Sequence, residues 1–266
     1  MKLIILIIML LTLACSKEPA IFIKGEFGEN KYSLSELLER PDVESVVITG
    51  SPDYPGGSRT YKAVRVSTLF KEIKMPEDAM ILFQAFDGFS APISPTRLLN
   101  KSDKHSIAYI ALEDPKDPWP IIKKKGKSAG PFYLVWVNPE KSKISSEEWP
   151  YWLVGLEIKK SLKSEYPKIF PMDPKVSKGF KLFLKNCFPC HTINKQGESK
   201  IGPDLNLPMN PTEYFKLSVL KKLIRNPQDV RHWPEGRMLG FDKDILSDHD
   251  IEDVISYLEH MSKNKR

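Results

Sequence analysis

Short apolar runs separated by turn residues dominate the chain from about residue 21 to residue 162. Runs rich in β-branched and aromatic residues predict strands at 21–23, 45–49, 80–86, 107–112, 132–137 and 152–158. The segments 33–38 and 67–70 each begin with a serine and continue with helix-forming residues, which predicts two short capped helices. Turn signals such as Pro55-Gly56-Gly57 separate these segments. The pattern predicts an α+β domain of mixed strands and short helices over residues 20–162.

The apolar spacing becomes helical after residue 174. A first helix carries apolar residues at Val176, Phe180, Phe183 and Leu184. A second is predicted from Thr212 to Arg225, because Asn226-Pro227 would stop it. A third begins at Ser247, followed by Asp248 and Asp250 as in a capping box, and has one apolar face: Ile251, Val254, Ile255 and Leu258. Residues 174–263 therefore read as an all-α domain, joined to the first domain by a proline-marked linker at 163–173.

The first residues carry an export signal. A basic start at Met1-Lys2 precedes an apolar run from Leu3 to Ala14, which is too short to span a bilayer. Ala14-Cys15 resembles the cleavage site of bacterial lipoproteins, although Thr12 stands where that family usually has leucine. We predict a lipoprotein-type signal peptide at 1–14 and a lipid on Cys15, which would hold the protein on the periplasmic side of a bacterial membrane. The alternative is an ordinary signal peptide with an incidental cysteine.

One motif points to specific chemistry. Cys187-Phe188-Pro189-Cys190-His191 has the Cys-x-x-Cys-His spacing of c-type haem attachment. The two thiols would form thioethers with the haem vinyl groups, and the His191 imidazole would be the proximal iron ligand. A redox dithiol, a structural disulfide and half of a zinc site are alternatives. The only other cysteine is Cys15, which leaves too few ligands for zinc, so one covalent haem c is predicted.

The charge of the chain is mildly positive. Its formal net charge is +6, and nucleic acid is an improbable partner for an exported haem protein. A basic face would instead steer the protein toward acidic redox partners or anionic lipid. The densest basic run, Lys123-Lys124-Lys125 with Lys127, reads as a solvated loop.

Residues 174–263 resemble the class I cytochromes c. Four pieces match in order: Gly179-x-x-x-Phe183, the haem motif, Gly202-Pro203-Asp204-Leu205, and Leu246-Ser247 through Val254-x-x-Tyr257-Leu258. The resemblance implies that the first and last helices cross at Gly179 beside Tyr257. It also implies that the Pro203 carbonyl accepts a hydrogen bond from the proximal imidazole and orients His191.

The same resemblance implies a sixth iron ligand shortly before the last helix. Met238, among glycines in Gly236-Arg237-Met238-Leu239-Gly240, occupies that place. Met209 and His232 are the alternatives, together with an open site. His105, His249 and His260 are assigned no role, and His249 is expected to face solvent. An apolar shell from Phe180, Leu205, Leu223 and Phe241 would favour the reduced state.

The first domain faintly resembles the molybdopterin-binding domain of sulfite-oxidase-like oxidoreductases. The carrying segments are Tyr61-x-x-Val64-x-Val66-x-x-Leu69-Phe70, 85–90, 107–109 and Gly130-Pro131-Phe132. That family binds its metal through a cysteine, and this domain has none between Cys15 and Cys187. We therefore predict a cofactor-free docking domain. Its aromatic residues are expected to form a core rather than a ligand pocket: Trp119, Phe132, Trp136, Trp149, Tyr151 and Trp152.

Together these features predict an exported monohaem carrier of single electrons between redox partners, with no catalytic residues. An alternative is the electron-accepting part of a sulfite-oxidase-like oxidoreductase whose first domain binds substrate or pterin. A ligand sensor would need an open iron site.

Overall fold

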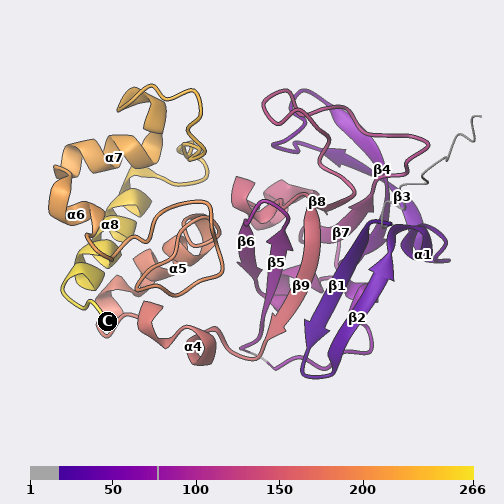
Figure 1. Ribbon diagram of the computed structural model, residues 1–266, viewed down its shortest axis with the longest axis horizontal. Coiled ribbons are helices and arrows are strands. Elements are labelled where there is room, and N and C mark those ends of the chain that lie inside the picture. Colours follow the sequence, from indigo (N-terminus) through magenta and orange to yellow (C-terminus); the bar gives the residue numbers. More distant parts are fainter. Residues whose placement is uncertain (1–17, 77) are drawn as a thin grey trace, which may run out of the picture.

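The computed structural model describes residues 18–76 and 78–266. A region of strands and short helices is followed by a helical region, as expected from the pattern (Figure 1). The predicted signal peptide at 1–14 and the predicted lipidation at Cys15 lie outside the described residues. Within the described ranges, every helix is too short or too polar to cross a bilayer.

Two sheets build the first domain. The five-stranded sheet has the order β2 (Gly28–Ser33), β1 (Ala20–Gly25), β9 (Leu153–Lys159), β5 (Met80–Ala85) and β6 (Ser90–Ile93). The four-stranded sheet has the order β3 (Val43–Thr49), β4 (Ser58–Arg65), β7 (Ile107–Leu112) and β8 (Phe132–Val137). β1 and β9 are parallel and the other pairs are antiparallel. The pairing of the first strand with the last closes the domain at Lys159.

All six predicted strands are present, but β2, β4 and β6 were not predicted as strands. β2 is a polar edge strand, and β6 is only four residues long and contains Pro92, so neither has an alternating apolar pattern. The predicted helices correspond to α1 (Leu34–Leu38), capped by Ser33, and α2 (Val66–Leu69). α3 (Pro95–Leu98) was not predicted.

The aromatic residues of the first domain form a packed core, as expected. Phe132, Trp136, Trp149 and Trp152 are buried, whereas Trp119 and Tyr151 are partly buried. The indole N–H of Trp136 donates to the carbonyl oxygen of Glu148 at 2.7 Å, so its one polar atom is satisfied in the core.

Four helices form the second domain: α5 (Ser177–Asn186), α6 (Pro211–Tyr214), α7 (Leu217–Arg225) and α8 (Asp248–Ser262). The prediction of one continuous helix from Thr212 was wrong. The backbone is extended at Phe215 and Lys216, which separates α6 from α7. The cap of α6 is Asn210, whose side-chain oxygen accepts from the Thr212 amide. Ser247 caps α8 in a capping box with Asp250, as predicted.

α5 and α8 cross in close contact at Gly179. A Cβ atom on Gly179 would lie 1.9 Å from the carbonyl oxygen of Asp253 and 3.1 Å from the Cβ of Tyr257. Only glycine lets the two backbones approach this closely. Tyr257 is fully buried and packs against Phe180 and Phe183, so the crossing lies in the centre of the helical core.

The segment expected to be a linker is packed against the second domain. It contains α4 (Leu162–Glu165) and the 3-10 turn η3 (Pro167–Ile169), and Leu162, Tyr166 and Ile169 are buried in the helical core. The Tyr257 hydroxyl donates to the Ile169 carbonyl at 2.7 Å. The remaining 3-10 turns are η1 (Pro139–Ser142), η2 (Ser146–Glu148), η4 (Pro174–Val176) and η5 (Pro227–Asp229).

Candidate functional site

The Cys187-to-His191 motif forms one tight turn at the end of α5. The amides of Cys190 and His191 both donate to the carbonyl oxygen of Cys187, at 3.0 and 2.9 Å. This turn continues the helical direction, so the residues that follow in sequence stay close in space. Both thiols are free, with no disulfide between them.

His191 is held in one orientation by the loop that follows the motif. Its Nδ1 donates to the carbonyl oxygen of Pro203 at 2.8 Å, which leaves Nε2 as the free acceptor nitrogen. A Cβ atom on Gly202 would lie 2.4 Å from Cε1 of the His191 ring, so only glycine fits there. Burial lowers the pKa of His191. The imidazole is therefore neutral at neutral pH, which is the form that binds iron.

Asp204 organises the same loop. Its carboxylate accepts from the Thr192 hydroxyl at 2.9 Å and from the amides of Lys195, Asn206 and Leu207 at 2.6 to 2.8 Å. From the sequence, Asp204 was identified only as part of a matching segment. Its role depends on bonds between residues on both sides of the loop, and no spacing rule predicts them.

Three buried asparagines connect this loop to the end of α8, and the sequence did not single them out. The Asn206 amide donates to Asn194 at 2.7 Å and to the Met261 carbonyl at 2.8 Å. The Asn210 amide donates to Asn206 at 2.9 Å and to the Leu258 carbonyl at 3.0 Å. These bonds satisfy buried polar groups and fix the loop that orients His191.

The environment of the two thiols differs from that of a redox dithiol. Burial, and then the charge of Glu147, raises the pKa of Cys187 to about 12 and that of Cys190 further. Reactive cysteines have a lowered pKa, because the thiolate is the nucleophile. In the described part of the chain, no group of three or more His, Cys, Asp or Glu side chains could hold a metal ion. Neither a thiolate redox pair nor a zinc cluster matches these surroundings.

Met238 lies in the irregular loop between α7 and α8, with its side chain 37% exposed. The loop is tied to the end of α7, because the Phe241 amide donates to the Arg225 carbonyl at 3.1 Å. The two alternative ligands are also exposed: Met209 follows the Leu207-Pro208 peptide, and His232 lies in the same loop as Met238.

The other histidines lie elsewhere. His249 is exposed in the first turn of α8, as expected, and His105 is exposed in the first domain. His260 Nε2 accepts from the Met172 amide at 3.2 Å, so it has a structural partner.

The haem motif faces the first domain. α5 lies beside the edge strand β6 (Figure 1), and the Ser90 amide of β6 donates to the Pro189 carbonyl at 3.2 Å. The Lys200 amide donates to the Gly88 carbonyl at 3.1 Å, and Arg237 pairs with Asp87 at 2.6 Å. The motif and the Met238 loop are therefore both attached to the loop between β5 and β6.

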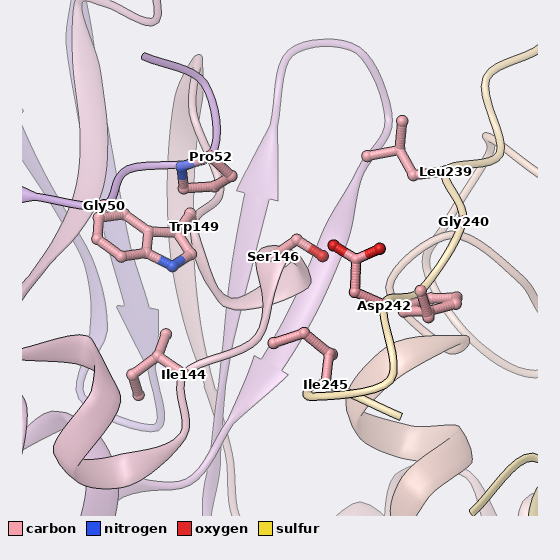
Figure 2. Close-up of a pocket in the computed structure, with 10 residues that line it drawn as sticks. Gly50, Pro52, Ile144, Ser146, Trp149, Leu239, Gly240, Asp242 and Ile245 are labelled. Atoms are coloured by element: carbon pink, nitrogen blue, oxygen red, sulfur yellow. The ribbon is translucent and has the colours of Figure 1, made fainter. Parts of the chain in front are cut away.

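A cleft of about 410 Å³ lies between the two domains (Figure 2). Residues 239–242 and Ile245, which follow Met238, line one wall. The facing wall comes from the first domain: Gly50, Pro52, Ile144, Ser146 and Trp149. The sequence did not predict this cleft, because its walls are 90 or more residues apart.

A buried carboxyl group lies between the cleft and the motif. Glu147 of η2 is 7% exposed, and its Oε2 is 3.9 Å from Sγ of Cys190. Burial, and then the charge of Asp53, raises the pKa of Glu147 to about 7. Asp53, whose own pKa is raised to about 6 by burial, accepts from the Tyr133 hydroxyl at 3.0 Å. Neither acid carries a motif, and the sequence singled out neither.

The residues fit a covalently bound haem. Two protonated, unpaired thiols stand one turn apart beside a neutral imidazole whose ring is fixed, and Gly202 leaves space against that ring. Residues 176–262 match the family model of Cytochrome c. The C-terminal domain of this chain is a class I cytochrome c domain, the domain of electron-transfer proteins that carry covalent haem c.

Proposed function

We propose that the protein is an exported monohaem cytochrome that passes single electrons between redox proteins, with the N-terminal domain as a docking domain. The observation that carries the proposal is the fixed His191 ring beside two free thiols. Haem c, when bound, supplies a one-electron redox centre. The matched family supports electron transfer and redox protein partners.

Each site residue has one task in this proposal. Cys187 and Cys190 would hold the haem as thioethers, and His191 would bind its iron. Pro203 orients the His191 ring through its carbonyl oxygen, which is 2.8 Å from Nδ1. Met238 would supply the second iron ligand, and its loop is held in place by contacts with α7 and with the first domain.

Haem attachment is tested by replacing both cysteines with alanine. The wild-type chain should keep its haem after acid-acetone extraction, whereas the double variant should lose it. Covalent haem in the double variant would refute attachment through Cys187 and Cys190.

Met238→Ala should remove the weak thioether–iron band near the red end of the oxidised spectrum. Met209→Ala is the matched control and should leave that band in place.

Docking through the first domain is supported by a basic loop beside the exposed side chain of Phe86. Lys127 Nζ lies 4.0 Å from the Trp152 ring centre and 4.8 Å from that of Phe86, which is 71% exposed. Lys123 and Lys124 are exposed in the same loop. Positive charge of this kind accelerates encounter with an acidic partner.

The docking proposal is tested with electron-transfer rates to an acidic redox protein. Reversing Lys123 and Lys124 to glutamate should lower the bimolecular rate and flatten its dependence on ionic strength. Lys163→Glu, at an exposed position in the connecting segment, is the control. Equal losses in both variants would show that the loop is not the docking surface. Stoichiometric molybdenum in the purified protein would contradict a pure carrier.

Export and anchoring rest on the first residues of the sequence. The apolar run that ends at Ala14-Cys15 supports a lipid anchor on the periplasmic side of a bacterial membrane. Cys15→Ser should release the protein from the membrane fraction, with haem still attached if export continues. Membrane retention of that variant would refute the anchor.

A further inference from the structure

Glu147 is a buried acid with almost no protein partner. Its carboxyl group accepts one long contact, from the Cys190 thiol at 3.9 Å. Across the described residues, no Lys, Arg or His nitrogen lies within 4.0 Å of it. The adjacent Glu148 takes both nearby cations, Arg97 at 2.8 Å and Lys185 at 3.2 Å. A carboxylate at this position is therefore desolvated and uncompensated.

The charged groups around Glu147 come from several elements. Asp53 contributes negative charge from the loop after β3, and Asp87 is paired with Arg237. Around the site, other titratable groups also face it from η2, α5, the haem motif and the β8–β9 connection: Glu148, Lys185, Cys187, Cys190 and Tyr151. The net effect of these neighbours favours the neutral acid.

Haem attachment would remove the one thiol hydrogen that points at Glu147, because Cys190 becomes a thioether. A haem held through Cys190 would supply, next to this carboxyl group, a centre whose charge changes by one unit with each electron. A nearby positive charge favours the carboxylate, and loss of that charge favours the acid. We propose that Glu147 takes up one proton from solvent for each electron that a redox partner delivers, and releases it when the electron leaves.

This inference rests on the proposed electron-transfer function and adds a proton to it. One electron and one proton enter together, so the charge of the site is unchanged and no further reactant is needed. In the chain without haem, burial and the charge of Asp53 raise the pKa of Glu147 to about 7, so an added charge nearby would move this pKa within the neutral range. A group with an ordinary carboxyl pKa would stay ionised in both redox states.

The cleft provides the route to water. Ser146, the residue before Glu147, lines the cleft opposite Asp242 (Figure 2). The Ser146 side chain is partly exposed, whereas Glu147 is not. The cleft wall next to Glu147 is therefore where a proton would enter from solvent.

The test is the midpoint potential of the full-length, haem-loaded protein between pH 5 and pH 9. The potential of the wild type should fall as the pH rises through the region around 7, with a slope approaching about 59 mV per pH unit, the value for a tenfold change in a one-electron equilibrium. Glu147→Gln should make the potential independent of pH in this region. Above pH 8 the variant should have the higher potential, since it lacks the negative charge that favours the oxidised state. Glu140→Gln, at an exposed site in η1, should keep the wild-type slope.

Two further measurements do not depend on how well the Gln variant folds. Reduction of the wild type in weakly buffered solution at pH 7 should consume protons, and Asp53→Asn should move the sloping region to lower pH. A slope that persists in Glu147→Gln, or no proton uptake by the wild type, would overturn the proposal. If the haem is reducible but its potential does not depend on pH, the role of Glu147 is refuted and the electron-transfer function is not. If the chain carries no reducible haem, the electron-transfer function itself is refuted.

Discussion

The helix crossing at Gly179 gives the sharpest stability prediction. Replacing Gly179 with alanine places a methyl group 1.9 Å from the Asp253 carbonyl oxygen, where ordinary contact needs about 3.4 Å. The neighbouring atom is backbone, so it cannot rotate away. α5 and α8 would have to separate by about 1.5 Å, which loosens the packing of Phe180, Phe183 and Tyr257.

Two opposing effects set the magnitude. Alanine gains about 1 kcal/mol over glycine in helix propensity. Overpacking of a close contact costs about 1–3 kcal/mol and occasionally more, and here the whole contact between two helices must move. We expect the overpacking to exceed the propensity gain and a net loss of about 2 kcal/mol, which for a domain of this size is a fall in Tm of about 8–16 °C.

The assay is thermal unfolding of the haem-loaded protein, followed by circular dichroism and by haem absorbance. Lys181→Ala, at an exposed position of the same helix, is the control and should change Tm little. If Gly179→Ala unfolds at or above the wild-type temperature, helix propensity exceeds the steric cost and the close crossing is wrong.

Three other changes test the loops and the domain contact. Asp204→Ala removes the acceptor of four hydrogen bonds and should cost about 2–4 kcal/mol in urea unfolding, whereas Asp204→Asn should recover part of that loss. Arg237→Gln breaks the ion pair with Asp87 and should increase proteolysis of the Met238 loop while changing global stability by less than about 1 kcal/mol. In haem-free protein, the folded-state pKa of Glu147 is raised from 4.5 to about 7. The contribution of this group to the free energy of unfolding is therefore fully present below pH 4.5 and is lost as the pH rises through 7, by roughly 3 kcal/mol in total. Glu147→Gln should remove that fall in urea midpoints measured from pH 5 to pH 8.

The sequence predicted elements best where the signal was local. Ser33 and Ser247 cap helices because their hydroxyl groups reach amides only three residues away. The second helix was predicted wrongly. The helix cap is Asn210, two residues before Thr212. The extended backbone at Phe215 and Lys216 separates α6 from α7. The short polar strand β2 gave no apolar alternation, since an edge strand buries little.

The sequence alone determined the haem motif and the first and last helices around it, because a tight turn and a helix cap act over a few positions. The close approach at Gly179 followed from the resemblance to the class I cytochromes c. Only the tertiary structure decided what surrounds the motif. β6 binds Pro189, Asp87 holds Arg237, and η2 places Glu147 against Cys190, although these pairs are some 40 to 150 residues apart. Burial at such contacts depends on how two domains meet, and burial is what raises the pKa of Glu147 to about 7 and turns an ordinary carboxylate into a candidate proton acceptor.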